Sequence, residues 1–573
     1  MKLNKKSMVA LLTLLALLVS FSACGNPDLK LATDGETEYV IVRPEQSSTT
    51  INSAAIKLKN AINKATGADI SVISDTEDRE SSDGPEILIG KTNRTLNNDN
   101  GPLKEKEFSI FVDGSRLVFM GGSDESVLDA VLFFIDNHLE EETEKLRLKG
   151  DFTHDYRHDY PINALNLGTN SIGMYSVVIP EEATAYEIYT AEFLINHIYQ
   201  TVGYRLELVE DSEEESDYEI LIGATNRSAS VQAGEVSLGE TEYIFGMVDK
   251  KLVIAGDGYL VAGGAGELIN KHIVVQSEGA DINLEIGSEL QPKELVFEEA
   301  KSVILMIGDG MGFNQVKITE LDGLGQFSAS FLPNKGSMTT VNVFGGVTDS
   351  AAAGTALATG YKTANSRLGL DKDENVVENV RELAERKGGM TGVITTDYIH
   401  GATPGAFLVH HRDRANSTVI KEQIEELNVD YLGGYVGNNL LKSTKECLAL
   451  LSEGDFFFLM IEESEIDPAG HANNHDWVIR SVKRFDESII YAMVFTVINP
   501  ETVLIVTADH ETGGLTERDN GSFEFTTGGH SSAPVPVYAI GKGTEMFDDT
   551  EVDNTDVAKF IASVYGETNF GQE

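Results

Sequence analysis

The sequence predicts an α/β protein in which a mostly parallel central sheet flanked by helices follows two smaller tandem α/β (α+β) domains. Apolar runs of strand length recur in the C-terminal half, among them Val303–Ile307, Phe456–Ile461 and Val503–Thr507. Strands that are apolar on both faces are typical of parallel sheets covered by helices. A second observation, an internal repeat further upstream, predicts the two smaller domains.

The repeat is carried by Glu86–Arg94, which returns as Glu219–Arg227 and differs only at its sixth position. Val42–Glu45 likewise corresponds to Val178–Glu181, in the same order along the chain. Each copy predicts a strand, a helix, a strand that ends in Ile-Gly, a hairpin and a second helix. Neither copy contains a catalytic set of residues. A spacer or docking role and a carbohydrate-binding role therefore both stay open.

The N-terminus is predicted to be a secretory signal. Lysines precede the apolar run Met8–Val19, which is too short to cross a bilayer comfortably. Phe21–Cys24 resembles the lipobox of bacterial lipoproteins, where cleavage leaves a diacylglyceryl group on the cysteine. That resemblance implies an extracytoplasmic lipoprotein of a bacterial cell membrane, anchored at Cys24. Ordinary signal cleavage that leaves a free thiol is the alternative.

These features divide the chain into four predicted segments: a signal peptide of lipoprotein type (1–23), an accessory repeat (36–150), a second accessory repeat (160–290) and a C-terminal domain (300–573). The polar stretch Gly287–Lys301 is predicted to be the linker to the last domain. The formal net charge of −48 excludes a general affinity for nucleic acid. An enzyme that acts on anions from such a surface needs local positive charge, which bound divalent cations supply.

Acidic residues stand directly after the predicted strands of the C-terminal domain. Asp309, Glu462 and Asp509 follow the three apolar runs, and they should converge because ligands of parallel sheets bind beyond the carboxyl ends of the strands. Asp467 and His471 are four residues apart, so both can reach one cation from a single helical turn. Two further imidazoles are available, His510 and His530. Carboxylates and imidazoles without thiolates suit zinc and, where all ligands are oxygens, magnesium.

Ser350 is the predicted nucleophile. It begins a run of small residues that ends at Gly360 and reads as a helix whose first turn aims N–H groups at a phosphate. A serine at the start of an alanine-rich helix also fits a plain N-cap, and that interpretation stays open for Ser350 taken alone.

Read together, these segments resemble the alkaline phosphatase family closely, over a region from about Ser302 to Gly541. The resemblance is carried by six motifs in order: Gly308–Gly312, Asp349–Ala351, Ala402–Pro404, Asp467–His471, Thr507–His510 and Thr527–His530. It implies an alkaline-phosphatase-like sheet and a catalytic domain that hydrolyses small-molecule phosphate monoesters. It also allows a homodimer.

The resemblance also implies a role for each site residue. One zinc would be bound by Asp467, His471 and His530, and a second by Asp309, Asp509 and His510. A magnesium ion would be bound by Asp309, Thr403 and Glu462. Ser350 would be phosphorylated during turnover, and Arg414 would hold two phosphate oxygens through its planar fork.

The chain departs from the family pattern at Gly401, where the best-known members carry Asp or His around the third metal, and His400 stands one residue early. Glu463 and Glu465 add carboxylates beside Glu462. Two other functions stay open: a phosphodiesterase of the same superfamily, and a surface protein whose repeats bind a cell-surface polysaccharide while the phosphatase domain is vestigial. The absence of a Cys-x-Pro-x-Arg or Ser-x-Pro-x-Arg segment around Ser350 weighs against a sulfatase.

Overall fold

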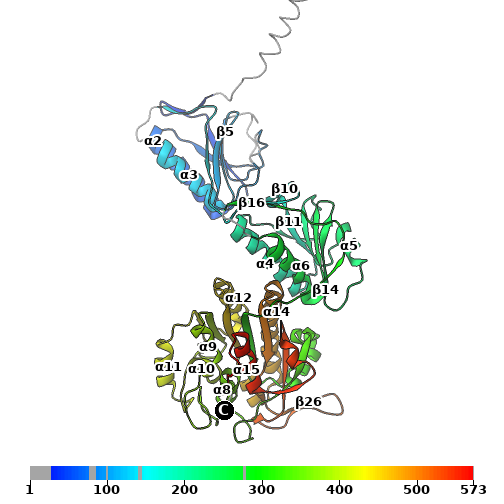
Figure 1. The fold of residues 1–573 in the computed structure, drawn as a ribbon. Helices are drawn as coiled ribbons and strands as arrows, with labels where there is room; N and C mark the ends of the chain where they lie inside the picture. Colours follow the sequence, from blue (N-terminus) through cyan, green and yellow to red (C-terminus); the bar gives the residue numbers. More distant parts are fainter. Residues whose placement is uncertain (1–27, 77–84, 98–100, 140–144, 275–278, 572–573) are drawn as a thin grey trace, which may run out of the picture. The chain divides into compact units, whose positions relative to one another are not determined.

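A computed structural model describes residues 28–76, 85–97, 101–139, 145–274 and 279–571. The predicted signal peptide (1–23) and the lipid anchor at Cys24 lie outside these residues. The chain folds into two compact units. Of the described residues, one unit contains those up to Val177 with Phe193–Leu208 and Ile273–Ile286; the other contains Val178–Glu192, Val209–His272 and those from Gly287 onward. Figure 1 labels the helices and strands of the chain. None of the helices in the described ranges combines the length and apolar character needed to span a membrane.

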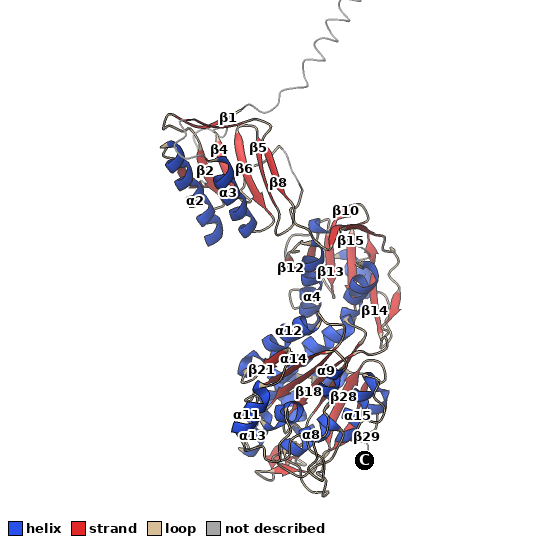
Figure 2. Cartoon of the chain, turned by 60° about the vertical axis from the view of Figure 1, so that its left-hand side comes forward, coloured by secondary structure: helices blue, strands red, loops and turns tan. Residues whose placement is uncertain are grey.

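The first repeat forms a six-stranded sheet with two helices, α2 (Thr49–Thr66) and α3 (Asp124–His138), packed side by side on it (Figure 2). The strand order is β3 (Ser71–Ser74), β2 (Val40–Arg43), β4 (Glu86–Ile89), β6 (Arg116–Gly121), β5 (Phe108–Asp113) and β8 (Thr153–Tyr156). A separate ribbon pairs β1 (Leu29–Thr33) with β7 (Lys145–Leu148). Apolar side chains of α2, α3 and the sheet make one buried core.

The second repeat forms a six-stranded sheet of equivalent order: β12 (Leu208–Glu210), β11 (Ser176–Ile179), β13 (Glu219–Ile222), β15 (Lys251–Ala255), β14 (Glu242–Val248) and β17 (Pro292–Glu294). Its helices are α4 (Ala185–Val202), α5 (Ser228–Gly234) and α6 (Val261–Glu267). A three-stranded sheet joins β10 (Asn170–Ser171), β9 (Ile162–Leu167) and β16 (Ala280–Leu284). The segment predicted as a linker thus contributes β17, which pairs with β14.

The residues shared by the repeats build the same hydrogen-bond network twice. In the second repeat the buried Arg227 donates from Nε to Glu219 (3.3 Å) and from a terminal nitrogen to the carbonyl of Asp211 (2.9 Å). The backbone N–H of Asn226 donates to the Asp211 carboxylate (2.6 Å). The same contacts recur in the first repeat among Asp75, Glu86, Asn93 and Arg94. The residues common to the two repeats therefore form a structural hydrogen-bond network at the strand ends.

The C-terminal half contains an eight-stranded sheet whose order is β21 (Tyr431–Gly433), β20 (Met390–Thr395), β22 (Phe457–Glu463), β18 (Ser302–Gly308), β23 (Thr502–Thr507), β28 (Val535–Ile540), β19 (Asn334–Thr339) and β29 (Glu551–Asp553). The first five of these strands run parallel, and only β28 pairs antiparallel with its neighbours. Every residue of β18 is buried. The predicted mostly parallel α/β sheet is confirmed.

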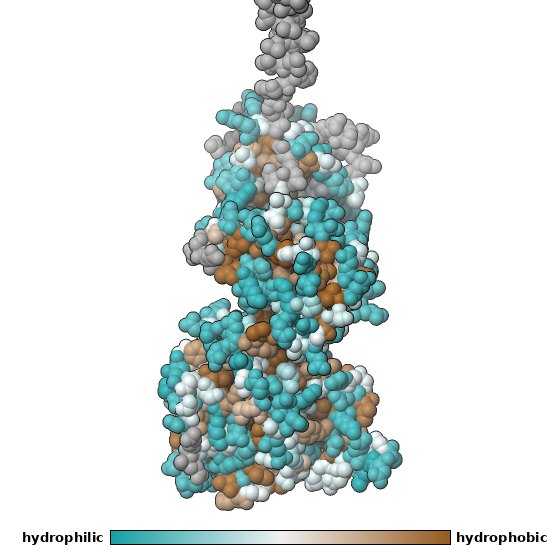
Figure 3. All heavy atoms as spheres, turned by 45° about the vertical axis from the view of Figure 1, so that its right-hand side comes forward, coloured by the Kyte–Doolittle hydropathy of each residue, from teal (hydrophilic) through white to brown (hydrophobic). Residues whose placement is uncertain are grey.

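Helices cover this sheet in two groups. The long α14 (His475–Ile498) packs with α12 (Leu440–Leu451), where Cys447 is buried. The other group packs around α8 (Ser350–Thr359), which contacts both α10 (Ala402–Leu408) and α15 (Asn554–Val564). The remaining helices are α7 (Phe313–Thr319), α9 (Val380–Arg386), α11 (Ser417–Glu425) and α13 (Ile466–His471). On the face drawn in Figure 3, hydrophilic side chains cover much of the surface, as the acidic composition leads one to expect.

The register of three central strands brings the acidic residues to one edge. Ile307 of β18 lies opposite Glu462 of β22 on one side and Thr507 of β23 on the other. Asp309 and Asp509, each two residues beyond these positions, therefore leave the sheet beside Glu462. This is the carboxyl edge, where ligands of parallel sheets bind.

The network of the second repeat gives the first prediction. Replacing Arg227 by Met leaves the buried Glu219 carboxylate without its guanidinium, and breaking a buried ion pair costs on the order of 3 kcal/mol. We expect calorimetry of the full chain to show a lower unfolding temperature for the transition that involves this repeat.

Lys250→Met is the matched control, because the Lys250–Asp217 pair is exposed and such pairs contribute less than about 1 kcal/mol. Equal transition temperatures for the two variants would contradict a structural role for the shared network.

Candidate active site

Two carboxylates and one imidazole meet at the carboxyl edge of the sheet. The Nε2 atom of His510 lies 3.5 Å from Oδ1 of Asp309 and 3.3 Å from Oδ2 of Asp509. All three residues are buried, and neither of these carboxylate oxygens has a hydrogen-bond partner among the described residues. The other oxygen of Asp509 accepts from the N–H groups of Gly310 (3.2 Å) and His510 (2.9 Å), which fixes the carboxylate. The ligand atoms are close enough to hold one metal ion.

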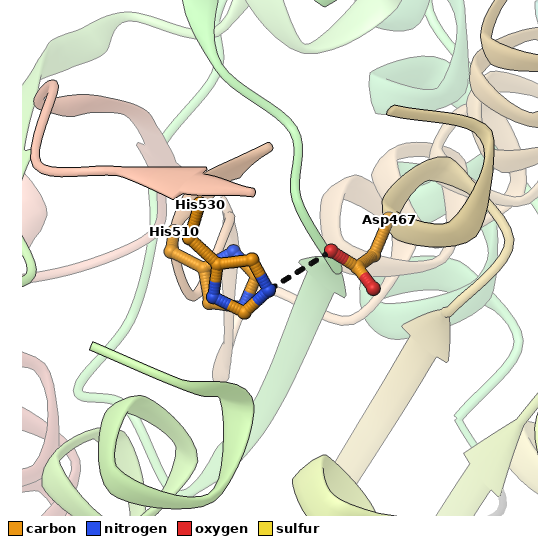
Figure 4. Close-up of side chains that lie close together, drawn as sticks. All are labelled: Asp467, His510 and His530. Atoms are coloured by element: carbon orange, nitrogen blue, oxygen red, sulfur yellow. Dashed lines mark ion pairs between the residues drawn. The ribbon is translucent and has the colours of Figure 1, made fainter. Parts of the chain in front are cut away.

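A second group lies directly beside the first. The short strands β24 (Glu511–Thr512) and β27 (His530–Ser531) pair antiparallel, and this pairing stacks His530 on His510 with ring centroids 3.7 Å apart. Nε2 of His530 is 3.4 Å from Oδ1 of Asp467 (Figure 4), and Nε2 of His471 is 3.3 Å from the other oxygen of Asp467. The three residues predicted for one cation thus lie together, and His510 approaches this group as well.

Backbone carbonyls orient two of the imidazoles. Nδ1 of His471 is 2.8 Å from the carbonyl of Gly528, and Nδ1 of His530 is 2.9 Å from the carbonyl of Thr348. A carbonyl only accepts, so each ring carries its proton on Nδ1, and each Nε2 presents a lone pair to the other at 3.2 Å. Burial lowers the pKa of His530, but hydrogen bonding and the charge of Asp467 outweigh it and raise the pKa. The two lone pairs and the Asp467 carboxylate would therefore be stabilised by a cation between the two Nε2 atoms.

A threonine orients the third imidazole. Thr512 donates its hydroxyl proton to Oδ1 of Asp467 (2.6 Å) and so accepts from Nδ1 of His510 (3.2 Å). Nε2 of His510 is left with a lone pair that faces the Oγ atom of Ser350 at 3.2 Å. Thr512 was not predicted as a site residue, although side chains two residues apart in an extended segment point to the same side, as those of His510 and Thr512 do. Thr348 was not predicted either, because it acts through its backbone carbonyl, which any residue has.

The buried carboxylates cannot all remain ionised without a compensating charge. Burial, and then the charge of Asp509, raises the pKa of Asp309 well above its usual value. Burial likewise raises the pKa of Asp509 to about 7, with a further contribution from Asp467. The pKa of Glu462 rises to about 8, first through burial and then through the charges of Asp397 and Asp509. A divalent cation bound by these groups would remove the electrostatic cost.

Glu462 and Thr403 form a third, all-oxygen group next to Asp309. Thr395 donates its hydroxyl to Oε2 of Glu462. The Thr403 hydroxyl is buried and lies close enough to Glu462 to oppose part of the rise in pKa that burial causes in this carboxylate. Both side chains offer only oxygen atoms as ligands. Such an oxygen set fits a hard cation such as magnesium.

The two additional glutamates of this region are engaged elsewhere. Arg484 donates from Nε to Oε2 of the buried Glu463 (2.6 Å), and Trp477 donates from its indole nitrogen to Glu465 (2.9 Å). Neither carboxylate is therefore free to join the third group.

Ser350 is the first residue of α8, but it does not cap the helix. Asp349 is the N-cap, because its Oδ1 accepts from the N–H of Ala352 (3.0 Å). The plain N-cap interpretation of Ser350 is therefore wrong, and its hydroxyl stays available beside His510. The other oxygen of Asp349 accepts from the N–H of Ser366 (2.9 Å) and lies 3.6 Å from the guanidinium of Arg414. This contact holds the partly exposed Arg414 side chain beside Asp349, the residue that precedes Ser350.

Known proteins resemble the C-terminal half. The model of the family described as alkaline phosphatase matches residues 300–436 and 436–526. Alkaline phosphatase 4 of Bacillus subtilis is 31% identical over 320 residues, which are 41% of this chain and 68% of that protein. Alkaline phosphatase 3 of the same organism is 27% identical over 340 residues, 46% of this chain and 71% of that protein. Among solved structures, the alkaline phosphatase of the Antarctic bacterium TAB5 is 28% identical and covers 47% of this chain and 99% of its own, with a TM-score of 0.45.

The raised pKa values predict how the metal-free protein responds to pH. Asp509 and Glu462 have pKa values of about 7 and about 8, above the value of about 4 of an unfolded carboxyl. Between those values the folded state holds more protons than the unfolded state, so stability falls as the pH rises from about 4 to about 8. We expect the Tm of chelator-treated protein to fall across this window, and zinc with magnesium to restore it at pH 8.

The variant with Asp509→Asn and Glu462→Gln is the control, since it lacks both titrations and should show a flatter fall. The same pH dependence in the variant and the wild-type protein would contradict this assignment.

Proposed function

The chain belongs to the alkaline phosphatase family, and we propose that it hydrolyses phosphate monoesters through a phosphoserine intermediate on Ser350. The observation that carries this proposal is the position of the Ser350 hydroxyl. It is buried, it does not cap the helix, and it lies 3.2 Å from Nε2 of His510, a residue that belongs to both groups of potential metal ligands. A nucleophilic hydroxyl needs such a setting to be activated at moderate pH.

We propose two zinc ions and one magnesium ion as cofactors. The residues for the zinc ions are Asp467, His471 and His530, and Asp309, Asp509 and His510; those for magnesium are Asp309, Thr403 and Glu462. Their chemistry supports this division, because imidazole nitrogens with carboxylates suit zinc and an oxygen-only set suits magnesium. When bound, such cations lower the pKa of a nearby hydroxyl or water and neutralise the charge of a departing oxygen.

The reaction then consists of two displacements at phosphorus. In the first, the Ser350 hydroxyl loses its proton to solvent and its Oγ forms a bond to phosphorus, while the bond to the ester oxygen breaks and the leaving alkoxide takes a proton from water. In the second, a water molecule loses a proton to solvent and its oxygen bonds to phosphorus, while the bond to Oγ of Ser350 breaks and Oγ regains a proton, which releases inorganic phosphate. Arg414 holds two non-bridging oxygens with its planar fork, and Asp349 orients that fork.

The role of Arg414 favours a monoester over the diester of the alternative function. A phosphate monoester offers the fork a doubly charged group with free oxygens, whereas a diester carries a second substituent on one of them. The intact set of ligand atoms around Ser350 likewise favours an enzyme over a vestigial domain attached to a glycan-binding module.

We further propose that the mature protein is an extracytoplasmic lipoprotein of a bacterial cell membrane, anchored through Cys24. The basic start, the apolar run and the lipobox-like segment of the sequence support this location. In such a protein the two repeats would serve as a spacer or docking module or as a polysaccharide-binding module. Their shared network of buried polar contacts is structural, which favours the first of these roles.

The Ser350→Ala variant tests the proposed reaction. With zinc and magnesium present, release of p-nitrophenol from p-nitrophenyl phosphate should fall by at least ~10³-fold, because no other group forms the covalent intermediate. Quenched wild-type protein should carry a phosphate on Ser350 in peptide mass spectrometry.

Ser417→Ala is the matched control, since Ser417, like Ser350, is the first residue of a helix and the preceding residue, here Asn416, caps that helix. It should leave turnover unchanged. A panel with bis(p-nitrophenyl) phosphate and p-nitrophenyl sulfate separates the alternatives. Faster turnover of the diester would favour the phosphodiesterase, and equal turnover by wild type and Ser350→Ala would favour a vestigial domain.

A further inference from the structure

Asp397 lies beside Glu462 of the third, all-oxygen group, and the proposed function gives it no role. It follows β20 by two residues, and its backbone N–H donates to the hydroxyl oxygen of Thr395 (2.9 Å). The same hydroxyl donates its proton to Oε2 of Glu462. One threonine thus ties the backbone of Asp397 to the carboxylate of Glu462. On the other side, the N–H of Tyr435 donates to the carbonyl of Asp397 (2.5 Å), which fixes the backbone further.

The side chain of Asp397 points toward the start of α10, the helix that carries Thr403. A Cβ atom at Gly401, the residue before this helix, would lie only 2.4 Å from Oδ2 of Asp397. The backbone of Gly401 (φ −60°, ψ 173°) is open to any residue, so its conformation does not require glycine. The missing side chain at position 401 instead leaves the room that the Asp397 carboxylate occupies.

No hydrogen bond or ion pair to the Asp397 carboxylate is found within the described part of the chain. Oδ1 of the buried Asp309 takes part in no hydrogen bond with the described residues, and the Thr403 hydroxyl is buried beside Glu462. The charge of Asp397 is also close enough to affect Glu462. Carboxylates held near one another in this way repel, unless a cation lies among them.

We propose that Asp397 supplies a further carboxylate to the third cation site, together with Asp309, Thr403 and Glu462, and that this site takes magnesium. The inference rests on the proposed function, to which the third site belongs. Three carboxylates and a hydroxyl offer only oxygen ligands. Magnesium prefers such ligands, whereas zinc sites usually include nitrogen or sulfur. Asp397 therefore determines how tightly the third cation is held.

Magnesium titration of the zinc-loaded full chain by calorimetry tests the assignment directly. Asp397→Asn keeps the shape of the side chain and removes its charge, so the Kd for magnesium should rise by roughly 10–100-fold, the usual effect of losing a supporting carboxylate. Asp548→Asn is the matched control, because it removes the same charge from an exposed position. Zinc content, measured by mass spectrometry, should stay equal in both variants.

Gly401→Ala provides a second, independent variant, because it leaves every charge in place and pushes the Asp397 carboxylate out of its position. It should weaken magnesium binding in the same direction. A wild-type Kd for magnesium in either variant would overturn the assignment of Asp397. Failure of the proposed function would show differently, as the absence of phosphate on Ser350 in the wild-type protein, whatever its magnesium affinity.

Discussion

Uncompensated negative charge at the carboxyl edge of the C-terminal sheet is the constraint on which the site depends. Asp309, Glu462 and Asp509 are buried there, and burial raises the pKa of each. Several oxygens of this region have no hydrogen-bond partner among the described residues. Burying such carboxylates costs free energy, and the proposed cations would offset that cost. Folding and cation binding would then be coupled in this half of the molecule.

The fold supplies the rigidity that such a site needs. Three parallel strands in register bring Asp309, Glu462 and Asp509 to one edge. The imidazoles arrive on shorter elements, and carbonyl or hydroxyl oxygens hold every one of them by Nδ1. This arrangement leaves each Nε2 aimed at the centre before any ion binds. Ligands oriented in advance lose less entropy when they bind a metal.

The sequence could predict those parts of the site that follow from strand ends and helical spacing. Apolar runs that end in Asp309 and Asp509 indicated the sheet edge, and the four-residue spacing of Asp467 and His471 indicated a shared cation. The pairing of β24 with β27 could not be predicted, because strands of two residues carry no periodic pattern. Contacts made through the carbonyls of Thr348 and Gly528 were equally invisible, since any residue offers a carbonyl.

Two other features of the structure could not be predicted from the sequence, because they too depend on tertiary contacts. The predicted linker contributes β17, because pairing with β14 depends on tertiary context and not on local apolar periodicity. Asp397 could not be recognised as a ligand from the sequence, because its carboxylate occupies the room left by the missing side chain of Gly401. In the repeats, by contrast, the repeated letters corresponded directly to contacts, because a buried Arg–Glu pair constrains residue type as strongly as a catalytic site does.

Anomalous diffraction at the zinc edge, on crystals of the full chain grown with zinc and magnesium, tests the central claim most directly. We expect two zinc peaks beside Ser350, one ligated by Asp309, Asp509 and His510 and the other by Asp467, His471 and His530. Zinc bound away from these residues, or a loaded crystal without a peak beside Ser350, would contradict it.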